Sequence, residues 1–206
     1  MFSLHRNGIA ALAAAVLAVA VLALAACGSS KKSSSSSSSS SSSAGALSAE
    51  AKSAATGDIP DNQVFLVFWN SKAGYSIKYP EGWTQRGTGG DVTFQDKNNL
   101  VHIVVGKGAA PTPASVTAQL DALRKSNRTL RFQQPQTMRV GASQVVKATY
   151  TTRSAPNPVT GKRVILLVDR YELTKGGRRA IVDLGTPKGV DNVDAYRMMI
   201  ESFRWR

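Results

Sequence analysis

Cys27 is a residue whose place in the sequence already indicates its chemistry. It is the only cysteine, and it follows an uncharged run from Ile9 to Ala26 that is rich in alanine, leucine and valine and comes after Arg6. A charged start, an apolar stretch and small residues before a cleavage point are typical of an export signal. Because no second thiol is present, we expect Cys27 to serve attachment rather than disulfide formation or catalysis.

The segment Leu24-Ala25-Ala26-Cys27-Gly28 resembles a lipobox, the pattern that prolipoprotein-processing enzymes read in bacteria. The resemblance implies that the Cys27 thiol is diacylglycerylated and that cleavage just before it leaves a lipid-bearing N-terminus. Two or three acyl chains anchor a protein stably, so we expect the protein on the outer face of the bacterial cytoplasmic membrane. Two alternatives stay open. One is an uncleaved transmembrane helix, since the apolar run is near the minimum length for a span; the other is a secretory signal without lipidation.

The other side chains that could do chemistry form no catalytic or metal-binding pattern. His102 is the only histidine after the signal segment, and strand alternation places it opposite Ile103 and Val105, at a surface or second-core position. A zinc site would need carboxylates almost alone, and no serine lies in a Gly-x-Ser-x-Gly elbow. We therefore expect no enzyme activity, no metal and no cofactor.

A hairpin around Lys175-Gly176-Gly177 is predicted by its glycine-rich turn. Pairing about this turn places Glu172 near Arg179. It also places Arg170 diagonal to Asp183, which gives an exposed ladder of opposite charges. The opposite face then carries Ile165, Leu167, Asp169, Tyr171 and Leu173.

Asp169 is a contact candidate because that face is expected to be apolar. A buried acid without a partner is costly, and a perturbed pKa can mark a site. A nearby hydroxyl, amide or arginine would satisfy the same carboxylate, and a register shifted by one residue would turn it outward.

Aromatic residues gather between Phe65 and Phe94. Trp69, Tyr79 and Trp83 are therefore contact candidates for a ligand or partner. The alternative is that these rings pack a sheet against its helices.

The formal net charge is +13 for the full chain. From Asp61 onward, 22 Lys and Arg face 11 Asp and Glu, so +11 belongs to the folded part. This excess favours anionic partners such as headgroups, cell-wall polymers or acidic proteins. Because we expect export and find no nucleic-acid-binding motif, we expect no nucleic acid partner. A basic surface that only aids solubility is the alternative.

Three segments follow from composition: a signal peptide over 1–26, a lipidated cysteine with a serine-rich tether over 27–60, and a domain over 61–206. The tether has almost no apolar side chains, so we expect it to be disordered.

The domain is predicted as strands with two helices. Hydrophobic periodicity and turn residues predict strands over 64–69, 75–79, 91–95, 100–105, 136–140, 144–152, 163–173 and 178–184. A helix is expected over 113–126, capped by Thr112, with Val116, Leu120 and Leu123 as its buried stripe. A last helix is expected to open at Asp191 in a capping box with Asp194, and to bury Val193, Tyr196, Ile200 and Phe203.

The segment from Gly74 to Trp83, Gly-Tyr-Ser-Ile-Lys-Tyr-Pro-Glu-Gly-Trp, resembles the opening signature of PsbP-like domains. A last helix running into Ile200-Glu201-Ser202-Phe203-Arg204 fits the same family over residues 63–206. With the lipobox and the tether, the chain looks like actinobacterial LpqN-like lipoproteins. The resemblance implies an α+β fold, an antiparallel sheet flanked by helices in an α/β/α sandwich. It also implies an accessory factor that binds other proteins.

These observations favour a lipid-anchored, monomeric binding module that contacts a protein or an anionic envelope component. The alternative is an envelope carrier with an apolar pocket for a lipid or small ligand. An enclosed cavity would favour the carrier, and an exposed aromatic or basic patch the binding module.

Overall fold

The computed structural model describes residues 57–157 and 161–206. The predictions for the signal peptide, for Cys27 and for nearly all of the tether fall on residues 1–56, outside the described residues. Across the two described ranges, no helix has the length and apolar character needed to cross a membrane.

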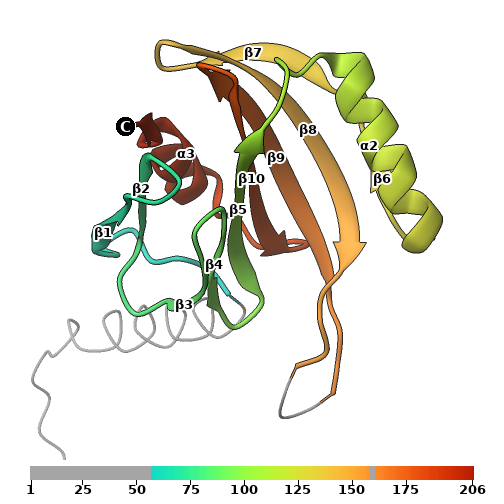
Figure 1. Ribbon diagram of the computed structural model, residues 1–206. Helices are drawn as coiled ribbons and strands as arrows, with labels where there is room; N and C mark the ends of the chain where they lie inside the picture. Colours follow the sequence, from blue (N-terminus) through green and yellow to red (C-terminus); the bar gives the residue numbers. More distant parts are fainter. Residues whose placement is uncertain (1–56, 158–160) are drawn as a thin grey trace, which may run out of the picture. The chain divides into compact units, whose positions relative to one another are not determined.

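A large antiparallel sheet forms the centre of the fold (Figure 1). Its strands lie in the order β3-β4-β5-β10-β9-β8-β6, and β7 also pairs with β8. Their bounds are Thr84–Thr88 (β3), Asp91–Asp96 (β4), Asn99–Lys107 (β5), Arg131–Phe132 (β6), Gln136–Val140 (β7), Ser143–Arg153 (β8), Ile165–Lys175 (β9) and Arg178–Pro187 (β10). Gly176 and Gly177 join β9 to β10 with φ angles of 58° and 73°, which two-residue hairpin turns require. The predicted hairpin is confirmed.

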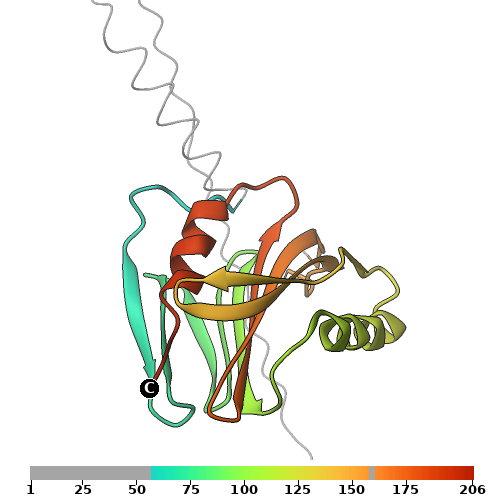
Figure 2. The ribbon, with the colours of Figure 1, turned by 90° about the horizontal axis from the view of Figure 1, so that it is seen from above.

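A second sheet of three strands has the order β1-β2-β11. It consists of β1 (Phe65–Asn70), β2 (Tyr75–Pro80) and β11 (Arg204–Trp205), and it lies beside helix α3 (Val193–Glu201). Figure 2 shows helix α2 (Pro113–Ser126) on one side of the large sheet, and α3 with the small sheet on the other. The predicted layered α+β fold, with helices flanking an antiparallel sheet, is confirmed.

Helix α2 begins as its sequence predicts. Thr112 Oγ1 accepts a hydrogen bond from the Ser115 amide at 3.1 Å, and the Thr112 amide donates to Ser115 Oγ at 3.0 Å. Val116 and Leu120 are fully buried against one face of the sheet. Leu123, predicted as the third member of this stripe, is 39% exposed, so the buried stripe of α2 ends at Leu120.

The other face of the sheet carries the aromatic core. Phe94 is fully buried and stacks on Tyr79, with ring centroids 4.2 Å apart, and meets Phe68 edge-on at 5.2 Å. Pro80 ends β2, and Gly82 turns the chain with a φ of 86°. Trp83 then enters the core. The Tyr-Pro-Glu-Gly-Trp segment is thus a turn that delivers an aromatic ring to the core.

Helix α3 differs from its prediction. Its N-terminal cap is Asn192, whose side chain turns inward, and Asp194 forms an ion pair with Arg197 instead of a capping box. Val193 is 61% exposed, and Met199 is fully buried in its place. Tyr196, Ile200 and Phe203, the other three residues predicted on the buried face, are buried as expected.

Asn192 ties the start of the domain to its core. Its Oδ1 accepts a hydrogen bond from the Ile59 amide at 2.8 Å, and its Nδ2 donates to the Gly57 carbonyl at 3.1 Å. Nδ2 also lies 3.2 Å from Asn99 Oδ1 and 2.9 Å from Thr186 Oγ1. Residues 57–59 are therefore part of the folded structure, ahead of Asp61.

Candidate interaction surface

An exposed patch of apolar and basic side chains lies where the small sheet meets α3. We call it the Trp69 surface; it comprises Val67, Trp69, Lys78, Met198, Arg204 and Arg206, which line one shallow groove. Trp69 is 61% exposed, Val67 46% and Met198 44%. Singly exposed apolar residues are normal, but neighbouring ones ringed by polar groups are typical of binding surfaces.

Strand alternation explains why Trp69 faces outward. In the β1–β2 register, Trp69 lies opposite Ser76 and Val67 opposite Lys78, whereas Phe68 lies opposite the buried Ile77. The face with Phe68 packs on the core, and the face with Trp69 is left toward α3 and solvent. The sheet thus presents an indole ring that folding does not bury.

Two arginine side chains, of Arg204 and Arg206, lie at the edge of the Trp69 surface and bond to neighbouring residues. The Arg206 guanidinium lies 4.0 Å from the centre of the Trp69 ring, and its Nε is 3.3 Å from Ser76 Oγ. Arg204 donates to the Glu201 carbonyl oxygen at 2.6 Å. Glu201 is the one acid among the residues that line the groove, so the surface favours an acidic ligand.

Strand β1 is the edge of the small sheet. Among the described residues it pairs with β2 alone, so one row of its backbone amides and carbonyls is open to another strand. An extended peptide can add to such an edge and place alternate side chains in neighbouring pockets. The exposed edge and the exposed Trp69 ring therefore belong to one continuous region.

The other two aromatic candidates, Trp83 and Tyr79, pack in or against the hydrophobic core. Trp83 is only 8% exposed and belongs to the core cluster, and Tyr79 is half-buried and stacked on Phe94. Neither is part of the Trp69 surface, because alternation in β2 directs Tyr79 toward the core.

Asp169 lines a pocket between α3, β7 and the sheet, with apolar neighbours such as Leu167 and Leu184, as expected. Its Oδ1 accepts a hydrogen bond from Thr149 Oγ1 at 2.6 Å, and its Oδ2 lies 2.8 Å from Lys147 Nζ. The nearby hydroxyl that the sequence allowed as a partner is therefore that of Thr149. Leu167, on the same face of β9, is 40% exposed, so this face is only partly covered. Asp169 is thus a paired acid at the mouth of the pocket.

The pocket that Asp169 lines has a volume of about 270 Å³. Its lining mixes apolar side chains, including Val140 and Ile200, with Tyr171 and Lys147. Burial of Lys147 opposes its charge, but the hydrogen bond and the charge of Asp169 outweigh that burial and raise the pKa of Lys147 above its ordinary 10.5. Burial also raises the pKa of Tyr171, so the lysine is charged and the phenol neutral at neutral pH.

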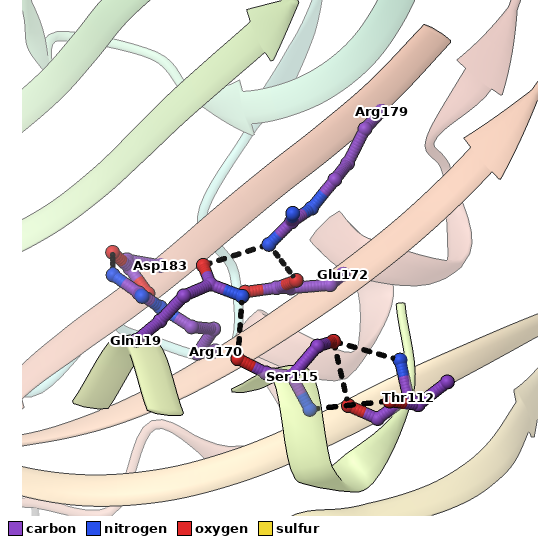
Figure 3. Close-up of polar contacts among 7 residues, drawn as sticks. All are labelled: Thr112, Ser115, Gln119, Arg170, Glu172, Arg179 and Asp183. Atoms are coloured by element: carbon purple, nitrogen blue, oxygen red, sulfur yellow. Dashed lines mark hydrogen bonds and ion pairs between the residues drawn. The ribbon is translucent and has the colours of Figure 1, made fainter. Parts of the chain in front are cut away.

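The expected ladder of exposed charges is wrong: Arg170, Glu172 and Asp183 are buried and Arg179 is partly buried, on the side of the large sheet where α2 lies (Figure 3). Arg170 makes a bidentate pair with Asp183, with Nε–Oδ1 and Nη2–Oδ2 distances of 2.8 and 2.7 Å. The two residues lie directly opposite each other, and not diagonally. Tyr150 covers Arg170, with the guanidinium 5.5 Å from its ring centre.

Arg179 forms a second group of polar contacts next to the Arg170–Asp183 pair. Its Nη2 donates to Gln119 Oε1 of α2 at 2.7 Å and to Glu172, whose side chain is fully buried (Figure 3). Glu172 and Arg179 are thus neighbours as predicted, but they join the helix to the sheet instead of facing water.

His102 is partly exposed on the same face of the sheet. Its Nε2 lies 2.9 Å from Asp91 Oδ1, a paired surface position that agrees with expectation. Within the residues that the structure describes, no three His, Cys, Asp or Glu side chains meet in a way that could hold a metal ion.

Solved structures with a similar fold include PsbP (CyanoP) from the cyanobacterium Synechocystis sp. PCC 6803. It is 15% identical, with a TM-score of 0.54, over 73% of this chain and 98% of that chain. A protein from Bacteroides thetaiotaomicron (17% identity, TM-score 0.45) covers 68% of this chain and 48% of its own. The Ran-binding protein Mog1p from Saccharomyces cerevisiae (10%, 0.44) covers 70% of this chain and 96% of its own. No family model matches the sequence, and no curated protein does so either. The chain therefore has a PsbP-like fold.

Proposed function

We propose that this chain is a lipid-anchored, extracytoplasmic binding module that holds an acidic segment of a partner protein on the Trp69 surface. The observation that carries the proposal is the Trp69 ring itself, which is 61% exposed beside Val67, Met198 and three cations. Tryptophan and arginine are the residue types on which binding energy concentrates at protein interfaces.

Cys27 supplies the anchor in this proposal. The lipobox-like segment before it supports acylation, and the serine-rich stretch after it would act as a flexible spacer. Mass spectrometry of the membrane fraction is expected to find a chain that begins with an acylated Cys27. A different N-terminus, or normal membrane retention of a Cys27→Ala variant, would contradict the anchor.

Binding rather than catalysis is proposed because the acids that lie close to a basic side chain on the large sheet are held in ion pairs. Asp169 is paired with Lys147, Asp183 with Arg170, Glu172 with Arg179 and His102 with Asp91. The one described histidine, His102, has no serine elbow motif in the sequence to act on. The Trp69 surface, in contrast, presents side chains that a partner could cover.

Crosslinking in cells, followed by purification of the chain from membranes, tests the binding surface. We expect a reproducible partner protein whose recovery falls about 30-fold for Trp69→Ala, since truncating a central interface residue costs about 2 kcal/mol or more. Ile165→Ala is the matched control, because Ile165 is also exposed but lies on β9. Equal losses for both variants, or no reproducible partner, would contradict the proposal.

A carrier of a small apolar ligand is the second candidate, favoured by the pocket of about 270 Å³ beneath α3. Typical ligand pockets measure roughly 300–1,000 Å³, so only a small ligand would fit. Native mass spectrometry of the protein from membranes tests it: a bound ligand that is lost in Val140→Trp and kept in Trp69→Ala would support the carrier.

A further inference from the structure

A cluster of four cations lies at the C-terminal end of α2. Lys125, Arg128, Arg153 and Arg163 line one open concavity. We call it the α2-end cluster. Lys125 lies at the helix end, Arg128 in the segment after it, Arg153 at the end of β8, and Arg163 in the segment just before β9, so folding brings them together. All four are exposed.

The α2-end cluster has no acid among its lining residues. Within the described parts of the chain, none of its four cations takes part in an ion pair; the nearby Asp121 on α2 pairs with Arg124, at 2.8 Å. Gathering like charges costs free energy by mutual repulsion. An anion bound between them would remove that cost.

Asn127 fixes the helix end of the cluster. Its amide donates to the Leu123 carbonyl at 2.9 Å, and its Nδ2 donates to Thr152 Oγ1 of β8 at 2.6 Å. Its Oδ1 accepts from Thr129 Oγ1 at 2.7 Å. The segment that carries Lys125 and Arg128 is therefore bonded to the strand that carries Arg153.

Ser154 fixes the other side. Its carbonyl accepts a hydrogen bond from Arg163 Nη1 at 2.8 Å, and its amide donates to the Val164 carbonyl at 2.9 Å. Ser154 Oγ in turn accepts from the Val164 amide at 3.1 Å. Hydrogen bonds thus hold the segments that carry the cluster in place. The entropy cost of ordering side chains and loops when an anion binds is therefore smaller.

We propose that the α2-end cluster binds phosphate groups. Three of its four cations are arginines, whose planar guanidinium forks pair with two oxygens of a phosphate at once. The concavity is open, which suits a phosphodiester on a larger molecule as well as a free phosphate. This proposal is separate from the Trp69 surface and stands whether or not a partner protein binds there.

NMR titration of the full chain, observed at the arginine Nε–Hε signals in about 150 mM salt, tests the proposal. The probes are glycerophosphoglycerol, which is the headgroup of an anionic phospholipid, inorganic phosphate, and acetate. We expect at least one of the two phosphate compounds to bind at least tenfold more tightly than acetate. Preference for the diester would indicate a lipid headgroup as the source, and preference for inorganic phosphate a soluble ligand.

Charge reversal locates the site. Arg128→Glu with Arg153→Glu is expected to weaken phosphate binding at least tenfold. Among residues 57–157 and 161–206, neither guanidinium has a hydrogen bond or ion pair, so the fold should persist. Lys125→Glu with Arg163→Glu is a second variant with the same expected result. Arg86→Glu with Lys188→Glu, exposed cations elsewhere, makes the same change in net charge and is expected to alter binding less than twofold.

Three results would overturn the proposal. One is the absence of shifts with either phosphate compound. Another is equal binding of acetate, which would indicate a general anion effect. The third is an equal loss of affinity in the Arg86 and Lys188 control, which would assign binding to the net charge of the domain.

Discussion

Lys147 stays charged in a half-covered position because Asp169 lies 2.8 Å away. The pKa of Lys147 is raised in the folded chain, so the pair stabilises the fold fully at neutral pH. That contribution is lost as the pH rises through the raised pKa, where the lysine loses its proton. Loss of this ion pair should therefore lower the stability of the fold only in alkaline solution.

Replacing Asp169 tests how burial alone changes the pKa of Lys147. In Asp169→Asn we expect the pKa of Lys147 to fall below 10.5, because burial then acts without the opposing carboxylate. NMR titration of the lysine side-chain signals measures it, with Asp121→Asn as the control acid. An unchanged pKa would show that Asp169 does not hold the charge.

The Arg170–Asp183 pair leads to a stability prediction. Both side chains are more than 90% buried, and removing one partner leaves the other charge uncompensated, at a cost of about 3–5 kcal/mol. We expect Asp183→Ala to lower the free energy of unfolding in urea by that amount. The double variant Arg170→Met with Asp183→Leu should lower it by less than Asp183→Ala alone. A double variant that loses the sum of two single changes would contradict the coupling.

For single residues, the sequence predicted which side chains are neighbours better than it predicted whether they are buried or exposed. Trp69 and Trp83 are equally aromatic, yet one is exposed and the other buried, because the second follows a turn into the core. The hairpin register correctly made Glu172 and Arg179 neighbours. Their burial could not be predicted, because it depends on Gln119, which α2 brings from about 50 to 60 residues away in the chain.

Helices and strands were predicted best where the chain carries its own start and stop residues. The bounds of α2 match those expected from Thr112 and Pro113. Strand β3, in contrast, was not predicted: all five of its residues are exposed, so they show no hydrophobic alternation, and only pairing with β4 makes them a strand. The buried face of α3 was predicted correctly for Tyr196, Ile200 and Phe203, but its cap was not: Asn192 takes the place expected for Asp191 and accepts a hydrogen bond from the Ile59 amide.

The Asn192 contacts can be tested at the level of this helix and the segment before β1. Asn192→Ala would leave the Ile59 amide and the Gly57 carbonyl without this partner, and each buried unpaired group costs roughly 1–3 kcal/mol. We expect a loss of about 3 kcal/mol in unfolding free energy and faster hydrogen exchange at Ile59. Asn62→Ala, at an exposed site, is the control. Slow exchange at Ile59 in the Asn192 variant would contradict this role.

For the whole molecule, the two proposed surfaces are separated by the large sheet. Figure 2 shows β1, which carries Trp69, on the side of α3, and α2 on the other. A chain tethered at Cys27 could therefore hold a partner on one side and a phosphate group on the other. This arrangement was not visible in the sequence, since the α2-end cluster joins residues from 125 to 163.

The most direct test of the central claim is photo-crosslinking in cells from a photoreactive residue placed at position 69. We predict a covalent adduct with one membrane-associated or envelope protein, and no such adduct when the same residue replaces Ile165 on β9. The absence of an adduct from position 69, or the same adduct from both positions, would show that the Trp69 surface is not where this chain binds.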